Sequence, residues 1–111
     1  MFGFIKKYRI IFKLYCGVKK GDAGKFEESL KCFDDVLKID PNCVKAIEFK
    51  GVLCEKNEKY DEALKYYELS TKVNPTNSKG WVGKGKLLSR LERYDEAIQW
   101  YDKSLEIKKM I

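Results

Sequence analysis

The chain has 111 residues, 44% of them hydrophobic and 36% charged, so one small domain with a modest core is expected. It contains no histidine, which excludes His-based acid–base catalysis and the Ser–His and Cys–His nucleophile pairs. The net charge of +6 is local, because residues 1–25 hold seven basic residues and one acidic residue and the rest of the chain is neutral. A case for nucleic acid or an anionic membrane as a partner therefore depends on the N-terminal end.

The four cysteines are widely spaced, at Cys16, Cys32, Cys43 and Cys54, and form no C-x-x-C motif. Without histidine they do not complete a zinc or iron–sulfur ligand set, so we expect no metal and no cofactor. We interpret them as small buried hydrophobic residues in a reducing compartment. The apolar stretch near the N-terminus is interrupted by Lys13 and shows no secretory signal, so the chain is expected to be cytoplasmic.

The N-terminal segment 1–20 is predicted to form an amphipathic helix. At 100° per residue, one side gathers the cations Lys6, Arg9, Lys13 and Lys20. The other side carries the apolar residues Phe4, Ile5, Tyr8, Ile11, Phe12, Tyr15, Cys16 and Val18. The favoured interpretation is that this apolar side packs onto Phe26, Leu30 and Phe33. The alternative is a peripheral anionic-membrane or nucleic-acid adaptor that acts through residues 1–20.

The following helices are predicted from apolar periodicity and stop signals. A corner at residues 21–24 contains two glycines, and a helix over about 44–57 ends at the polar corner 57–59. From Tyr60, apolar residues at spacings of 3 and 4 predict a helix up to Val73. Asn74-Pro75 stops it, because proline disfavours helical geometry in the residue before it. The last helix is predicted from about 94 to 107, and loops this short make paired helices antiparallel.

A 34-residue internal repeat organises these helices. Shifting the chain by one such period superposes Gly17, Gly51 and Gly85, and it also superposes Phe33, Tyr67 and Tyr101. Tyr60-Asp61-Glu62-Ala63-Leu64 falls on Tyr94-Asp95-Glu96-Ala97-Ile98. The predicted units are 10–43, 44–77 and 78–111, with 1–9 as an N-terminal extension of a single domain.

In these positions and in its period the sequence resembles the tetratricopeptide repeat, whose pattern is W-x₂-L-G-x₂-Y…A-x₃-F…P. The third unit reads Trp81-x₂-Lys84-Gly85-x₂-Leu88…Ala97-x₃-Tyr101. The second unit reads Ile47-x₂-Lys50-Gly51-x₂-Cys54…Ala63-x₃-Tyr67…Pro75. The first keeps Gly17, Phe33 and Pro41 but has Lys13 and Ser29 at motif positions, so it is a degenerate copy.

The resemblance implies an all-α, right-handed helical-repeat solenoid of three antiparallel helix pairs. It further implies a non-catalytic scaffold that binds a partner segment in a concave groove lined by the first helix of each unit. The family's groove positions fall on Ile11, Leu14, Tyr15, Val18, Lys45, Glu48, Phe49, Val52, Lys56, Lys79, Val82, Lys86 and Arg90. This surface suits a protein or peptide with acidic and apolar side chains, although a solvated face without a specific ligand has the same composition.

One branch of the family clamps chaperone C-terminal carboxylates with Lys, Asn and Arg at fixed groove positions. Lys79 matches that arrangement, but Val18 and Val52 stand at its Asn positions and Gly83 at an Arg position. The resemblance therefore disfavours such a clamp.

The C-terminal helix is predicted to leave one side without a neighbouring helix. Repeat arrays normally end in an element with a polar outer face. Here the residues expected on that side are Trp100, Leu105, Met110 and Ile111. We therefore predict weak homodimerisation through this end of the molecule.

Overall fold

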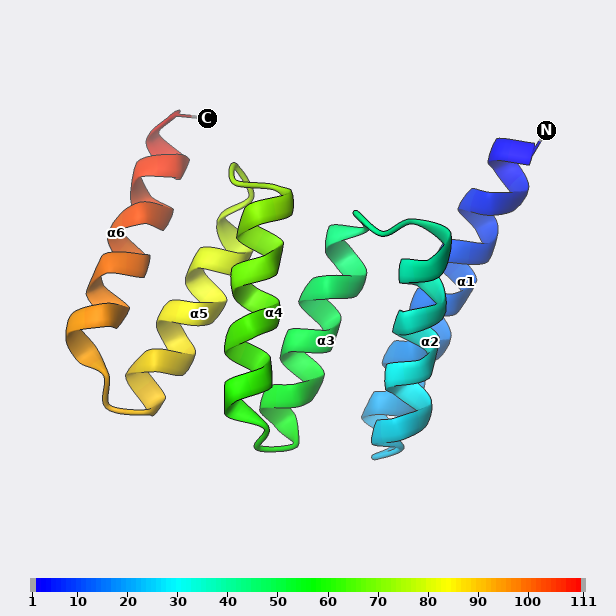
Figure 1. The fold of residues 1–111 in the computed structure, drawn as a ribbon, viewed down its shortest axis with the longest axis horizontal. Helices are drawn as coiled ribbons and strands as arrows, with labels where there is room; N and C mark the ends of the chain where they lie inside the picture. The colour runs from blue at the N-terminus through cyan, green and yellow to red at the C-terminus, as the bar shows by residue number, and fades with distance from the viewer. Residues whose placement is uncertain (1, 111) are drawn as a thin grey trace.

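The computed structural model describes residues 2–110, which form six helices and no strand (Figure 1). In chain order these are α1 (Phe2–Asp22), α2 (Phe26–Ile39), α3 (Val44–Lys56), α4 (Tyr60–Val73), α5 (Ser78–Arg90) and α6 (Tyr94–Met110). Each helix packs on the next in the chain, and the first helices of neighbouring pairs, α1 with α3 and α3 with α5, also touch. The pairs follow one another along the long axis of a molecule that measures 46 × 33 × 17 Å.

The first helix is longer than the repeat predicts. Helix α1 is continuous from Phe2, so part of the predicted extension 1–9 is helical and joins the first helix of the first unit without a break. It also runs through Gly21 to Asp22, which leaves only residues 23–25 in the corner. Gly24 in that corner has φ +77°, a left-handed conformation that glycine adopts without a steric penalty.

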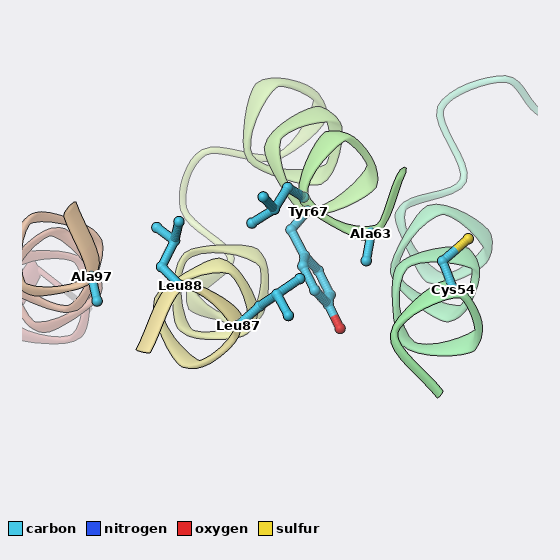
Figure 2. Packing of buried hydrophobic residues seen from close by; sticks show 7 residues of the cluster. Cys54, Ala63, Tyr67, Leu87, Leu88 and Ala97 are labelled. Atoms are coloured by element: carbon cyan, nitrogen blue, oxygen red, sulfur yellow. The ribbon is translucent and has the colours of Figure 1, made fainter. Parts of the chain in front are cut away.

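Two buried clusters form the core. One joins α3, α4, α5 and α6 through Cys54, Ala63, Leu64, Tyr67, Leu87, Leu88 and Ala97. Figure 2 shows Tyr67 extending from α4 into the space between α3 and α5. The other joins α2 and α3 through Phe33, Val36, Ala46 and Leu53, and α1 contributes Ile10 and Leu14 at its edge. Half-buried Phe26 of α2 packs against both clusters, so the two clusters adjoin there.

Glycines let an aromatic ring of each second helix lie directly on the preceding first helix. A Cβ atom on Gly17 would fall 2.6 Å from the Phe33 ring, and one on Gly51 would fall 2.8 Å from the Tyr67 ring. The third pair repeats the contact between Gly85 and Tyr101 at 3.1 Å. The repeated glycines therefore permit the close approach of the two helices in each pair.

Two lysines at a motif position that is normally apolar connect neighbouring pairs. Lys50 is only 8% exposed, pairs with Asp34 of α2, and lies 4.6 Å from the ring centroid of Tyr66 in α4. Burial by itself lowers the pKa of Lys50, but the hydrogen bonds to Asp34 and Tyr66 outweigh it and raise the pKa above its usual value. One repeat later, Lys84 pairs with Glu68 and lies over the Trp100 ring.

The departures of the first unit from the motif have partners of their own. Ser29, at the usual alanine position, is buried and donates a 2.6 Å hydrogen bond to the Gly17 carbonyl. Lys13, at the usual tryptophan position, forms a 3.1 Å ion pair with Asp35. The hydrogen bond from Lys13 lowers the pKa of Asp35. The first unit is therefore a complete helix pair with a more polar contact.

Replacing Gly51 with alanine tests the ring–glycine contact. The added methyl group overlaps the Tyr67 ring, so Gly51→Ala should lower the free energy of unfolding by about 1–3 kcal/mol in urea denaturation. Gly3→Ala is the matched control, because a Cβ there has no atom within 4 Å and alanine favours the helix. Equal stability of the two variants would contradict the assigned role of the contact.

The buried thiol of Cys54 predicts a loss of stability at alkaline pH. Burial, followed by the charge of Glu62, raises the pKa of Cys54 from 9.0 to about 11. The raised pKa contributes to the free energy of unfolding, and this contribution is fully present below pH 9.0. It is lost as the pH rises towards 11, because in that range the thiol ionises in the unfolded chain but not in the folded one. Chemical unfolding should show this loss, on the order of 2 kcal/mol, and a shallower one for Cys54→Ala. Identical pH slopes for both proteins would show that Cys54 does not cause it.

Candidate peptide-binding groove

A wide hollow lies between the first helices of the second and third pairs. It has a volume of about 510 Å³ and is lined by Lys45, Glu48, Phe49, Val52, Glu55, Tyr67, Ser78, Lys79, Val82, Gly83, Lys86 and Lys108. A second hollow of about 420 Å³ shares Val52, Glu55 and Tyr67 and continues to Lys56 and Arg90. A third, of about 120 Å³, lies between α1 and α3 and includes Val18. We call the first two hollows together the groove.

Most of the site residues expected from the family positions line these hollows. In the groove they are Lys45, Phe49, Val52, Lys56, Lys79, Val82, Lys86 and Arg90, and in the small hollow Val18. Leu14 does not, because it packs against the cluster around Phe33 and Val36. Tyr15 lies outside the hollows and is exposed, with the Lys19 ammonium 5.6 Å from its ring centroid. The groove is therefore built mainly from α3 and α5.

The floor of the groove is apolar and rests on the core. Phe49 stacks on Phe33 of α2 with ring centroids 5.5 Å apart. The ring of Tyr67 lies against α5 as well as α3, since a Cβ atom on Gly83 would fall 2.9 Å from it. Val52 remains exposed above this floor. Apolar side chains of a ligand could therefore contact Phe49, Val52 and Val82.

Asn77 fixes the start of α5 relative to α3. Its side-chain oxygen accepts a 3.1 Å hydrogen bond from the backbone N–H of Lys79, which caps the helix. Its amide nitrogen donates a 2.7 Å hydrogen bond to Glu48 of α3. The carboxylate of Glu48 is thus engaged in holding the two walls of the groove together.

The charges at the far end of the groove are compensated within the protein. Glu55 accepts a 2.8 Å hydrogen bond from the Tyr67 hydroxyl and forms an ion pair with Arg90. Burial, and after it the hydrogen bond to Glu55, raises the pKa of Tyr67, so the phenol remains protonated. Lys56 lies 3.7 Å from Asp22 of α1. Arg90 and Lys56 are therefore weaker candidates for ligand contact than their positions suggest.

Four lysines of the groove keep their charge uncompensated. Among residues 2–110, no carboxylate lies within 4.0 Å of Lys45, Lys79, Lys86 or Lys108. The hollow thus places cations around an apolar floor, an arrangement that attracts carboxylates and apolar groups together.

Several residues that line the groove were not predicted from the sequence, among them Tyr67, Glu55 and Lys108. Tyr67 has the spacing of a core residue, and nothing in that spacing shows that one edge of its ring reaches the hollow. Glu55 lies one turn beyond Val52 on the same helix, so helical spacing from Val52 could have predicted its place in the groove. Lys108 arrives from α6, and no local motif relates it to α3 or α5.

Among the residues predicted to be exposed on the C-terminal helix, Trp100 differs from the prediction. Trp100 is half-buried, with its ring centroid 4.8 Å from that of Trp81, and it does not lie on the outer side. Leu105 and Met110 are exposed as expected, and Ile111 lies outside the described residues. Tyr94 and Ile98 add to the exposed apolar surface of α6. Trp100 is held inward because Lys84 and Trp81 of α5 both contact it.

The antiparallel helix pairs of residues 2–110 define a helical-repeat protein. A family model described as tetratricopeptide repeat matches residues 20–72 and 55–109. The chain therefore belongs to the tetratricopeptide repeat family. A search of curated proteins finds no match.

Solved structures of the same fold include tetratricopeptide domains seen with a bound peptide. The structure described as the second TPR of Spaghetti (RPAP3) bound to HSP90 peptide SRMEEVD has a TM-score of 0.78 and 20% sequence identity, covering 93% of this chain and 97% of that one. The first TPR of the same protein, with the same peptide, has a TM-score of 0.82 and 20% identity, covering 92% and 83%.

The protein MamA has the same fold. Its TM-score is 0.84 at 15% identity, with 91% of this chain covered, and this chain spans 59% of that one. These similarities confirm the fold class, an all-α, right-handed solenoid of antiparallel helix pairs. The family assignment makes the chain a protein-interaction module.

Proposed function

We propose that the chain is a non-catalytic scaffold that binds, in the groove between α3 and α5, a protein segment carrying acidic and apolar side chains. The observation that carries the proposal is the set of four uncompensated lysines beside the apolar floor. Carboxylates of the ligand would pair with Lys45, Lys79 and Lys86 from the walls, and an apolar side chain would rest on Phe49 and Val82.

The structural neighbours support this class of ligand. The peptide SRMEEVD in the two RPAP3 structures contains acidic and apolar residues, as the proposed ligand does. The chain nevertheless has Val52 and Gly83 where the carboxylate-clamping branch of the family uses Asn and Arg. We therefore propose recognition of side chains along a segment, without a requirement for a free C-terminal carboxylate. The four free cysteines fit a reducing compartment, so we propose that binding takes place in the cytoplasm.

Reversing two groove charges tests this site. The double variant Lys79→Glu, Lys86→Glu should bind at least about tenfold more weakly to acidic peptides selected on the wild-type chain from a displayed library, because both cations would become repulsive. Fluorescence anisotropy of a labelled selected peptide measures the affinity, and circular dichroism verifies the fold. The matched control is Lys65→Glu, Lys72→Glu, which reverses two exposed lysines of α4 outside the hollows.

Two results would contradict the proposal. One is unchanged affinity in the folded Lys79/Lys86 variant. The other is an equal loss in the Lys65/Lys72 control, which would show that net charge alone governs binding.

We also propose weak self-association through the outer side of α6. Ile98 and Leu105 are both more than half exposed there, and each buried apolar side chain contributes roughly 1.5–3 kcal/mol. Sedimentation velocity should show the average mass rising with concentration. Ile98→Lys, Leu105→Lys should abolish this rise, whereas Leu69→Lys on α4 should leave it unchanged. A single monomeric species of the wild-type chain at all concentrations would overturn the prediction.

A further inference from the structure

The side of α1 that faces away from the domain is apolar and aromatic. Phe4 is 68% exposed, Tyr8 66% and Phe12 64%, and Ile5, Ile11 and Tyr15 are also exposed. At 100° per residue these six side chains share one side of the helix. Ile10, Leu14 and Gly17, which pack on the domain, lie on the opposite side. Helix α1 therefore has two apolar sides, and we call the exposed one the outer face.

The sequence expectation that the whole stripe packs on α2 is corrected here. Of the residues in that stripe only Cys16 is half-buried. The helix packs on the domain through Ile10, Leu14 and Gly17 instead. Residues 3–9 are exposed. Figure 1 shows the reason, because the first turns of α1 extend past the end of α2 at one end of the molecule. The outer face is accordingly available to a partner.

Cations border the outer face and no acidic residue opposes them. On the helical wheel, Lys7 lies at one edge of the face and Arg9 at the other, and Lys19 lies within the face, one turn beyond Tyr15. Residues 2–21 contain six basic residues and no Asp or Glu. Lys13 and Lys20 have carboxylate partners in α2, but Lys6, Lys7, Arg9 and Lys19 have none among the described residues. The N-terminal turns therefore present an uncompensated positive charge.

The outer face does not have the side chains of a repeat-stacking surface. Phe12, Ala46 and Gly80 occupy the same position of the 34-residue repeat. Ala46 of α3 and Gly80 of α5 are small and allow close contact with the preceding helix, whereas α1 has the large Phe12 there. Leu53 and Leu87 are buried in the same contacts, and their equivalent in α1 is Lys19. A helix approaching α1 as α2 approaches α3 would meet the Phe12 ring and bury the Lys19 charge. A second copy or another repeat stacked in this way is therefore disfavoured.

We propose that α1 is a membrane-surface helix that lies on an anionic lipid bilayer with its outer face in the headgroup region. Apolar residues on one side bordered by lysine and arginine are what such helices use, and long cationic side chains at the edges reach the lipid phosphates. The long side chain of Lys19 can carry its charge outward to a lipid phosphate, which the interior of a packed helix contact does not offer. No helix of the described residues is long and apolar enough to span a bilayer, so α1 would lie flat on the surface. Ile5 and Ile11 favour lipid over RNA, because aliphatic side chains do not stack on bases as aromatic rings do.

This surface is separate from the groove. The large hollow between α3 and α5 is lined by no residue of α1. The chain could therefore hold a peptide while its first helix rests on lipid, and would link a protein segment to a membrane surface.

Vesicle flotation with the full chain tests the proposal. The chain should float with vesicles of phosphatidylcholine containing about one-third phosphatidylserine and should remain unbound with pure phosphatidylcholine. Phe4→Gln, Phe12→Gln should reduce the bound fraction at least about tenfold, because both side chains are exposed and would insert. Lys7→Gln, Arg9→Gln should reduce partitioning roughly 25-fold, at about fivefold per cation.

Matched controls separate lipid binding from general changes in surface chemistry. Ile98→Gln, Leu105→Gln removes two exposed apolar side chains of α6, and Lys108→Gln, Lys109→Gln removes two of its exposed cations. Both controls, and the groove variant Lys79→Glu, Lys86→Glu, should float with at least half the wild-type efficiency. Failure of the groove would thus not affect this readout.

Three outcomes would overturn the proposal. The first is the absence of flotation with the anionic vesicles. The second is full binding by the Phe4/Phe12 variant together with loss in the Lys7/Arg9 variant, which would indicate electrostatic adsorption without insertion. The third is binding to a single-stranded RNA oligonucleotide with no binding to vesicles, which would assign α1 to nucleic acid.

Discussion

The contact between the Tyr67 ring and two glycine-containing helices determines the geometry of the groove. Gly51 of α3 and Gly83 of α5 both lack the Cβ atom that would push the ring away. The ring therefore sets the distance between α3 and α5, which are the two walls of the hollow. Its hydroxyl reaches Glu55, and Glu55 in turn holds Arg90. One core residue thus defines the width of the groove and removes one acidic and one basic group from competition for the ligand.

Lys50 of α3 and Lys84 of α5, each paired with an acidic residue of the preceding helix pair, bear on how successive helix pairs align. A hydrophobic residue at these positions would pack with any apolar neighbour, whereas Lys50 requires Asp34 on one side and the face of Tyr66 on the other. Buried ion pairs contribute little net stability, because desolvation offsets most of their attraction. Their repetition one period later, with Glu68 and Trp100, indicates a role in specifying how successive pairs align. We regard that role as a hypothesis for this chain.

The sequence predicted most of the fold because the 34-residue period and the proline stops are local signals. The helix starting at Tyr60 ends at Val73 as expected, and α3 ends within one residue of its prediction. Helix α6 continues past its predicted end at 107 to Met110. The positive charges of Lys108 and Lys109 stabilise this last turn because they lie at the negative, C-terminal end of the helix dipole. For α1 the 34-residue period alone places the start of the first unit at residue 10, whereas the amphipathic pattern of residues 1–20 predicts nearly the whole helix.

The groove residues could be predicted where the family positions assign a side chain to the groove. They could not be predicted where packing between helices distant in the sequence determines the direction of a side chain. The repeat positions of Phe49, Lys79 and Lys86 predicted that these residues lie on the side where the hollow between α3 and α5 is found. Trp100 was misplaced because its neighbours Trp81 and Lys84 belong to another helix and are distant from it in the sequence. The sequence also did not predict that α1 has one packed and one exposed apolar side. Apolar periodicity shows where a stripe lies on a helix, but it does not show how far the neighbouring helix covers that stripe.

Chemical-shift mapping tests the central claim that the groove between α3 and α5 is the binding surface. The measurement is a titration of the isotopically labelled chain with an acidic, apolar peptide, followed through its backbone amide signals. The account predicts the largest shifts at Phe49, Val52, Lys79, Val82 and Lys86, with little change at the exposed lysines of α4. Shifts confined to α1, α6 or the outer side of α4 would contradict it.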